Sequence, residues 1–94
     1  MAADRSKDTI DFKIVSFNCN GLREKAKRSR IFKLCDINSY DVVFLQETHI
    51  NTLTESQRWE SEWPGKCFWS HGTSQSRGVG ILFSKRFKPV VDSV

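Results

Sequence analysis

Two short polar segments of this 94-residue chain carry the side chains best suited to chemistry. Asn18 and Asn20 follow one hydrophobic run, and Gln46, Glu47 and His49 lie at the end of another. One carboxylate surrounded by amide oxygens suits a hard divalent cation such as Mg²⁺, which prefers oxygen ligands and keeps several waters. Beside basic side chains, such a cation would serve phosphate-ester chemistry, because the metal polarises a phosphoryl oxygen. The competing interpretation is that these residues only form turns where the chain returns to solvent.

The elements around these segments predict how they are brought together. Residues 12–17 are β-branched and aromatic and predict a strand, residues 26–38 predict a helix, and residues 42–46 predict a second strand. Strand, helix and strand with short connections form a βαβ unit, in which the strands are parallel and the crossover is right-handed. Parallel strands bring their carboxyl ends to one edge of the sheet, where α/β folds bind ligands. We therefore expect Asn18 and Glu47 to share that edge.

Hydrophobic patterning also predicts which faces are buried. The strand at 42–46 starts with four consecutive apolar residues, which is typical of a strand buried on both faces. Arg28 falls outside the apolar face expected for the helix at 26–38. That face has the spacing i, i+3, i+4 and i+7 and consists of Ile31, Leu34, Cys35 and Asn38.

The second half of the chain predicts one short helix and further strands. The helix is expected at residues 54–62, with Thr54 as its N-cap and Gln57 in the capping-box position. The strands are bounded by polar or glycine-containing segments. Two are expected at residues 67–71 and 79–84, and the start of another at residues 90–91.

The charge balance indicates a polyanionic partner. The chain has 15 Lys and Arg against 11 Asp and Glu, a net charge of +4, which suits a nucleic acid. A solvated helix face would have the same composition, so nucleic-acid contact is a hypothesis at this point. The candidate nucleic-acid-binding residues fall in one stretch and are Arg23, Lys25, Lys27, Arg28 and Arg30.

Composition excludes several classes of protein. The longest apolar run has four residues, so we expect no transmembrane helix and no membrane partner. Residues 1–11 carry both charge signs and no apolar core, which indicates a flexible leader rather than a secretory signal and predicts an intracellular protein. The three cysteines are widely spaced and predict neither a disulfide framework nor a zinc site.

Four motifs resemble one known family. Residues 13–23, Lys-Ile-Val-Ser-Phe-Asn-Cys-Asn-Gly-Leu-Arg, resemble the opening strand and turn of the endonuclease/exonuclease/phosphatase superfamily. Residues 41–49 resemble its second signature, a hydrophobic strand that ends in Gln-Glu-Thr. Residues 69–72 and 77–82 resemble the next two strands, in the same order. Within the superfamily, the chain is most similar to the apurinic-type endonuclease domains of non-LTR (LINE-like) retrotransposon polyproteins.

The resemblance implies a fold, a cofactor and partners. The family fold is an α/β (α+β) four-layer sandwich, two sheets with helices outside, of which residues 12–94 would be the N-terminal part. In the family, the residue matching Glu47 binds Mg²⁺ (or Mn²⁺), and the residue matching Asn18 helps to position the scissile phosphate or the metal-bound water. The position of Asn20 is Asp in many repair-type members and a metal-side ligand there, so Asn removes a negative charge. DNA, the rest of a retrotransposon polyprotein and a nuclear location are also implied.

The resemblance covers about the first third of such a domain, which runs to roughly 250 residues. The later motifs, which supply a Tyr, an Asp-x-Asn pair and a terminal Ser-Asp-His, are missing from the sequence. Since acid–base assistance contributes about 10²–10⁴-fold, the truncated chain should be nearly inactive alone, and its uncovered sheet faces should associate. We therefore expect a fragment of a Mg²⁺-dependent DNA endonuclease. The alternatives are a non-catalytic nucleic-acid-binding or interaction module and a phosphatase of the same superfamily.

Overall fold

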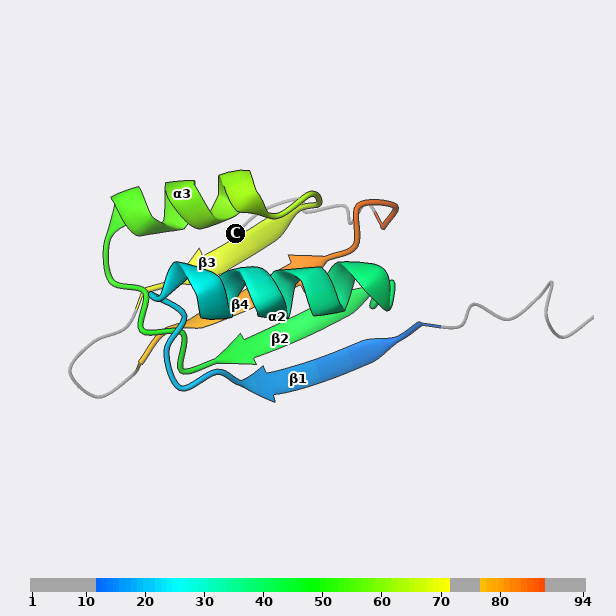
Figure 1. Ribbon diagram of the computed structural model, residues 1–94, viewed down its shortest axis with the longest axis horizontal. Helices are drawn as coiled ribbons and strands as arrows, with labels where there is room; N and C mark the ends of the chain where they lie inside the picture. Colours follow the sequence, from blue (N-terminus) through cyan, green and yellow to red (C-terminus); the bar gives the residue numbers. More distant parts are fainter. Residues whose placement is uncertain (1–11, 72–76, 88–94) are drawn as a thin grey trace, which may run out of the picture.

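The computed structural model describes residues 12–71 and 77–87, which form a four-stranded sheet with two helices (Figure 1). Every expected element within these residues is present, with bounds that shift by up to two residues. The expected leader at 1–11 and the strand start at 90–91 lie outside the described residues. In chain order the elements are β1 (Ile14–Asn18), α2 (Lys25–Ile37), β2 (Val42–Gln46), α3 (Leu53–Glu62), β3 (Cys67–Ser70) and β4 (Val79–Phe83).

The sheet is mixed, with the strand order β1-β2-β4-β3. β1 and β2 pair in parallel and in register, so that Asn18 lies opposite Gln46 at their carboxyl ends. β4 runs antiparallel to both β2 and β3, and its first residue, Val79, pairs with Gln46. The predicted parallel βαβ unit and the α/β (α+β) class are therefore confirmed. The start of β4 also lies at the edge where β1 and β2 end.

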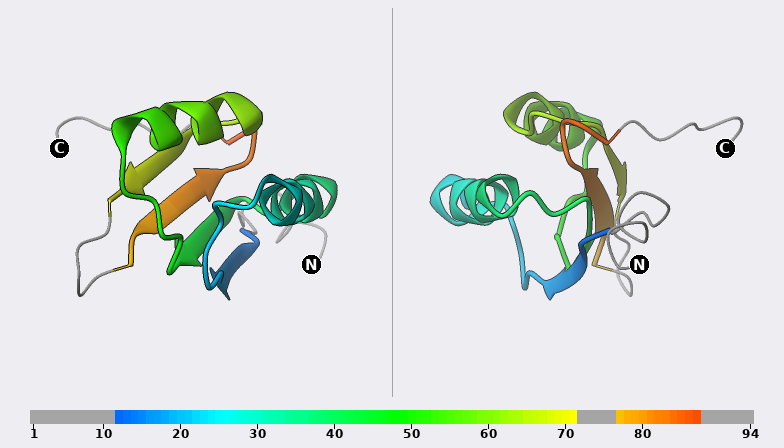
Figure 2. Two further views of the ribbon diagram at one scale, coloured as in Figure 1. Left: turned by 60° about the vertical axis from the view of Figure 1, so that its left-hand side comes forward. Right: turned by 90° about the vertical axis from the view of Figure 1, so that its right-hand side faces the viewer.

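Both helices cover the same face of the sheet, as the right-hand view of Figure 2 shows. The core lies between this face and the helices. It is built by side chains such as Val43 and Leu45 of β2, Leu82 of β4 and Trp59 of α3, all of them buried. Neither helix within residues 12–71 and 77–87 has the length and hydropathy needed to span a membrane.

The predicted inward face of α2 is partly wrong. Cys35 is buried as expected, but Leu34 is exposed, and the other buried residues of the helix are Phe32 and Arg28. The ring of Phe32 packs edge-on against Trp63 at a centroid distance of 5.5 Å. Phe32 of α2 therefore packs against a residue that is distant in the sequence. The apolar periodicity of a single helix does not reveal such a contact.

The expectation that β2 is buried on both faces is also wrong for the described residues. Its burial alternates, with Val43 and Leu45 buried and Phe44 41% exposed. Phe44 lies in register with Ile81 of β4, which in turn faces Phe68 of β3. These side chains belong to the sheet face opposite the helices, so the described residues leave an apolar surface there.

The N-cap of α3 lies two residues earlier than predicted. Thr52 is the N-cap, and its side chain accepts a hydrogen bond from the backbone N–H of Glu55 at 3.0 Å. Glu55 in turn accepts a hydrogen bond from the N–H of Asn51 at 3.1 Å. Thr54 and Gln57 fit the same capping pattern in sequence, but they lie two residues too late.

Candidate active site

Asn18 and Glu47 lie side by side at the carboxyl ends of β1 and β2. Asn18 is the last residue of β1, and Glu47 directly follows β2. The Nδ2 atom of Asn18 donates a hydrogen bond to Oε2 of Glu47 at 3.0 Å. The two side chains that the strand order predicts to meet are therefore in direct contact, and the amide orients the carboxylate. We call residues 18–22, 46–49 and 77–78 the site edge; it lies to the left in Figure 1.

Backbone hydrogen bonds hold the segment that carries Glu47 on both sides. On the β1 side, the N–H groups of Gly21 and Leu22 donate to the carbonyls of Glu47 and Thr48 at 2.7 and 2.9 Å. On the β4 side, the N–H of Thr48 donates to the carbonyl of Gly78 at 3.1 Å. The pairing of the strands therefore continues past their ends, and the loop is a fixed support for the carboxylate.

The site edge concentrates unusual backbone conformations. Asn20, Glu47 and His49 have positive φ angles of 51°, 54° and 64°, which are uncommon for residues other than glycine. Gly78 has a φ of 84°, and a Cβ atom there would lie 2.7 Å from Oγ1 of Thr48. Strained backbone of this kind persists only where the surroundings hold it, and it gathers at functional sites.

Two cations lie at the site edge, and Arg77 is the one that contacts the carboxylate. The Nη1 atom of Arg77, which lies two residues before β4, is 3.5 Å from Oε1 of Glu47. On the other side, Nζ of Lys27 donates to the carbonyls of Cys19 and Asn20. Arg77 was missed by reasoning from the sequence, because its partner is 30 residues away. The available signal was its position two residues before the strand that pairs with β2.

Comparison with known proteins identifies the family. Residues 15–94 match the endonuclease/exonuclease/phosphatase family. The chain belongs to this family. It is also similar to a protein of Xenopus laevis described as "Transposon TX1 uncharacterized 149 kDa protein", with 38% identity over 78 residues. That alignment covers 83% of this chain and 6% of the Xenopus protein. The resemblance drawn from the four motifs is therefore confirmed, together with the similarity to a transposon protein.

The two asparagines that matched the family motif are placed differently. Asn18 contacts Glu47 through its side chain. Asn20 is exposed, and among the described contacts it offers its backbone carbonyl to Lys27 rather than its side chain to Glu47. The ring of His49 packs against Gly21, where a Cβ atom would lie 2.9 Å from Nδ1 of His49. His49 therefore shapes the edge by packing, and its buried Nε2 has no hydrogen-bond partner in the described residues.

The donor set at the edge suits a hydrated Mg²⁺ ion. The side chain of Glu47 is 35% exposed, so one side of the carboxylate faces solvent. Mg²⁺ is commonly held by one or two carboxylates and keeps several waters, which one Glu and one neighbouring amide fit. Residues 12–71 and 77–87 contain no group of three His, Cys, Asp or Glu that could enclose an ion. Among the described residues of the site edge, Glu47 is the carboxylate that could hold such an ion.

Of the five candidate nucleic-acid-binding residues, Arg28 was predicted wrongly. It is only 2% exposed and forms an ion pair with Glu62, so its guanidinium cannot meet a phosphate at the surface. Arg23 is exposed but pairs with Glu55 at 2.6 Å. Lys25 and Arg30 are exposed, and Lys27 lies beside the site edge. The basic stretch therefore includes both surface cations and one buried structural residue.

The three cysteines are poorly suited to metal binding or to nucleophilic attack. All three are free, and Cys19 and Cys35 are buried. Burial raises the pKa of Cys19, Cys35 and Cys67 to about 11. Because the thiolate is the form that attacks and binds metals, protonated thiols at neutral pH are inert.

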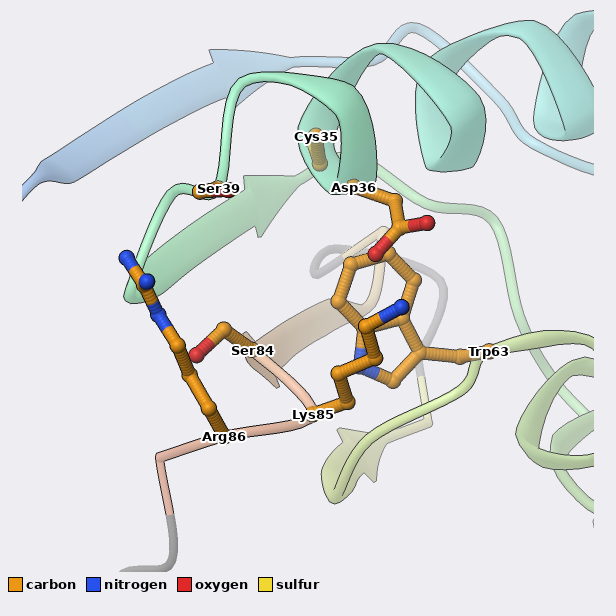
Figure 3. A pocket seen from close by; sticks show the side chains of 7 residues that line it. All are labelled: Cys35, Asp36, Ser39, Trp63, Ser84, Lys85 and Arg86. Carbon is orange, nitrogen blue, oxygen red and sulfur yellow. The ribbon is translucent and has the colours of Figure 1, made fainter.

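The pocket in Figure 3 lies at the opposite end of the sheet from the site edge. Ser84 and Lys85 follow β4, whose end lies beside the start of β2, and Cys35 and Asp36 come from the last turn of α2. Its volume is about 40 Å³, which is enough for a water molecule but not for an organic ligand. This pocket is therefore too small to hold a substrate.

Proposed function

We propose that this chain forms part of a Mg²⁺-dependent DNA endonuclease of the retrotransposon type, which hydrolyses phosphodiester bonds. The observation that carries the proposal is the contact between Asn18 and Glu47 on the shared edge of two parallel strands. The chain spans 6% of the length of the Xenopus transposon protein it matches, so the activity of a whole protein of that kind belongs to the proposal.

The residues of the edge have distinct roles in this proposal. Glu47 would hold the cation, and Asn18 would keep the carboxylate oriented and contact the phosphate or a metal-bound water. When bound, the cation polarises a phosphoryl oxygen of the substrate. Lys27 places a positive charge beside the edge, and Lys25 and Arg30 are exposed on α2. Exposed cations of this kind would attract the phosphate backbone of DNA, and salt would weaken the attraction. A nuclear location, where DNA is reached, is part of the proposal.

The first experiment measures metal binding without DNA. Mn²⁺ binding is followed by electron paramagnetic resonance for the wild type, Glu47→Gln and Glu60→Gln. Glu60 is exposed on α3, so its substitution removes the same charge elsewhere and serves as the matched control. We expect Glu47→Gln to abolish binding and Glu60→Gln to retain it. Equal affinities in the three proteins would contradict a metal site at Glu47.

The second experiment measures nicking of supercoiled plasmid with Mg²⁺. Activity that is abolished by Glu47→Gln and by EDTA, and retained in Glu60→Gln, would support the endonuclease. The described residues provide one carboxylate at the edge and no positioned acid–base partner, and acid–base assistance is worth about 10²–10⁴-fold. We therefore expect weak nicking by the isolated chain.

A non-catalytic nucleic-acid-binding module is the second candidate function. It is favoured by the exposed basic side chains along α2 and by the single carboxylate of the described site edge. Binding to DNA with a steep dependence on salt, without nicking and without an effect of Glu47→Gln on Mn²⁺ binding, would favour the module.

A further inference from the structure

Arg77 is positioned to act together with Glu47, although 30 residues separate them. Its Nη1 atom lies 3.5 Å from Oε1 of Glu47, and Asn18 contacts the other carboxylate oxygen at 3.0 Å. The side chain of Arg77 is 63% exposed. The guanidinium therefore stands between the carboxylate and solvent, on the side of the site edge that belongs to β4.

The backbone fixes the point from which this side chain reaches. The carbonyl of Arg77 accepts a hydrogen bond from the N–H of His49 at 2.6 Å, and the carbonyl of Gly78 accepts one from Thr48 at 3.1 Å. These bonds tie Arg77 to the loop that carries Glu47. A change of side-chain rotamer would therefore be enough to turn the guanidinium away from the carboxylate while the backbone stays in place.

The ion pair between Arg77 and Glu47 is weak enough for the arginine to change partner. It is a single contact at 3.5 Å between exposed groups, and such pairs contribute little because water and salt screen them. The other two cations near the edge are already occupied, Lys27 by backbone carbonyls and Arg23 by Glu55. The planar guanidinium of an arginine suits the oxygens of a phosphate.

We propose that Arg77 is a phosphate-binding residue of the site and that it serves as the counter-ion of Glu47 when no divalent cation is bound. The part that concerns the cation rests on the proposed function, whereas the phosphate contact does not. Arg77 thus links the two states of the edge: it pairs with Glu47 in the free protein and with a substrate phosphate when the carboxylate is engaged.

The chain offers a matched control in Arg86. Its side chain is 66% exposed and pairs with Asp41 at 3.9 Å. Asp41 directly precedes β2, so this pair lies at the end of the sheet opposite the site edge. Arg77→Ala and Arg86→Ala therefore remove the same charge from two arginines of similar exposure, and urea unfolding checks that each variant folds.

The first measurement is the affinity for Mn²⁺ in the absence of DNA. Removing the competing guanidinium should tighten binding in Arg77→Ala by about 1.5- to 5-fold, as expected for an exposed ion pair, whereas Arg86→Ala should match the wild type.

The second measurement is the binding of a 20-base-pair duplex, labelled for fluorescence anisotropy, over a range of NaCl concentrations with Ca²⁺ present. Arg77→Ala should weaken binding and lower the slope of log K against log[salt] by about one, and Arg77→Lys should restore the slope but only part of the affinity.

The outcomes separate this inference from the proposed function. If Glu47→Gln abolishes Mn²⁺ binding while Arg77→Ala changes neither measurement, the Arg77 inference is wrong and the metal site stands. If Arg77→Ala lowers the salt slope while Glu47→Gln has no effect on Mn²⁺, the phosphate contact stands and the nuclease proposal fails. Equal effects of Arg77→Ala and Arg86→Ala would overturn the inference, because they would reflect total charge alone.

Discussion

Replacement of Arg28 by methionine should remove the strongest polar connection between the two helices. Nε and Nη2 of Arg28 donate to the two carboxylate oxygens of Glu62 at 2.6 and 2.9 Å. Nη1 donates to the carbonyls of Leu22 and Arg23 at 3.0 and 3.2 Å. The guanidinium also lies 5.1 Å from the ring centroid of Trp59. One side chain therefore joins α2, α3 and the loop that follows β1.

The loss of stability expected for Arg28→Met follows from the burial of the ion pair between Arg28 and Glu62. Removing one partner of a buried ion pair costs about 3–5 kcal/mol, because the other charge stays behind without compensation. The side chain of Glu62 is 24% exposed, so water recovers part of this loss. We expect about 3 kcal/mol for Arg28→Met, at the lower end of that range. Small domains unfold with roughly 5–15 kcal/mol, so this is a fifth or more of the total.

Urea unfolding, followed by tryptophan fluorescence and far-UV circular dichroism, measures this change in free energy. Arg23→Ala is the matched control. Arg23 pairs at 2.6 Å with Glu55, which lies in α3 like Glu62, but the side chain of Arg23 is 59% exposed. Its loss should cost no more than about 1 kcal/mol. In the double variant Arg28→Met/Glu62→Leu no charge is left unpaired, so most of the stability should return.

Two results would refute this reasoning. One is a loss of stability in Arg28→Met that does not exceed the loss in Arg23→Ala, since burial would then have no effect. The other is simple additivity of Arg28→Met and Glu62→Leu in the double variant, because a real ion pair gives a coupling energy between its two members.

Three further predictions concern the glycine at the site edge, the open sheet face and acid stability. Gly78→Ala should lower the free energy of unfolding by about 1–3 kcal/mol in urea, because its φ is 84° and the new Cβ would lie 2.7 Å from Thr48; an unchanged midpoint would contradict the close approach. Phe44→Lys should reduce self-association in sedimentation velocity, because Phe44 is 41% exposed on an apolar face; a wild type that sediments as a monomer would argue against this. Hydrogen bonds from Arg28 hold the pKa of Glu62 below its ordinary value of 4.5, so its stabilisation is full above about pH 4.5 and is lost as the pH falls through the folded pKa. The acid-induced loss in urea midpoint should be smaller in Arg28→Met, and equal pH profiles would disprove the link.

Local pattern was sufficient for the part of the fold that positions Glu47. Two hydrophobic runs with a helix between them imply parallel strands, and parallel strands imply that Asn18 and Glu47 meet. Both inferences depend on the direction of the strands and on the handedness of their connection. Short connections leave few possible arrangements of these two features. The same rules do not say which face of a strand other elements cover. The four consecutive apolar residues of β2 therefore predict burial of Phe44, which is wrong.

The errors arose where distant residues decide between local alternatives. Arg28 follows the pattern of a surface residue in its own helix, and only the carboxylate of Glu62, 34 positions later, makes its burial possible. The cap of α3 was misplaced because Thr52 and Thr54 both satisfy the capping pattern, and the contact between Glu55 and Arg23 favours the earlier one. Arg77 was missed for the same reason as Arg28.

The loop at 47–49 is bonded on both sides, which has a consequence for synthesis of the chain. The bonds to Gly21 and Leu22 can form once β2 has left the ribosome, but those to Arg77 and Gly78 must wait about 30 residues more. At roughly 5–20 residues per second, this interval lasts a few seconds. During this interval the loop that carries Glu47 is bonded on the β1 side alone, so a ribosome-stalled intermediate that ends before residue 77 would lack the complete site edge.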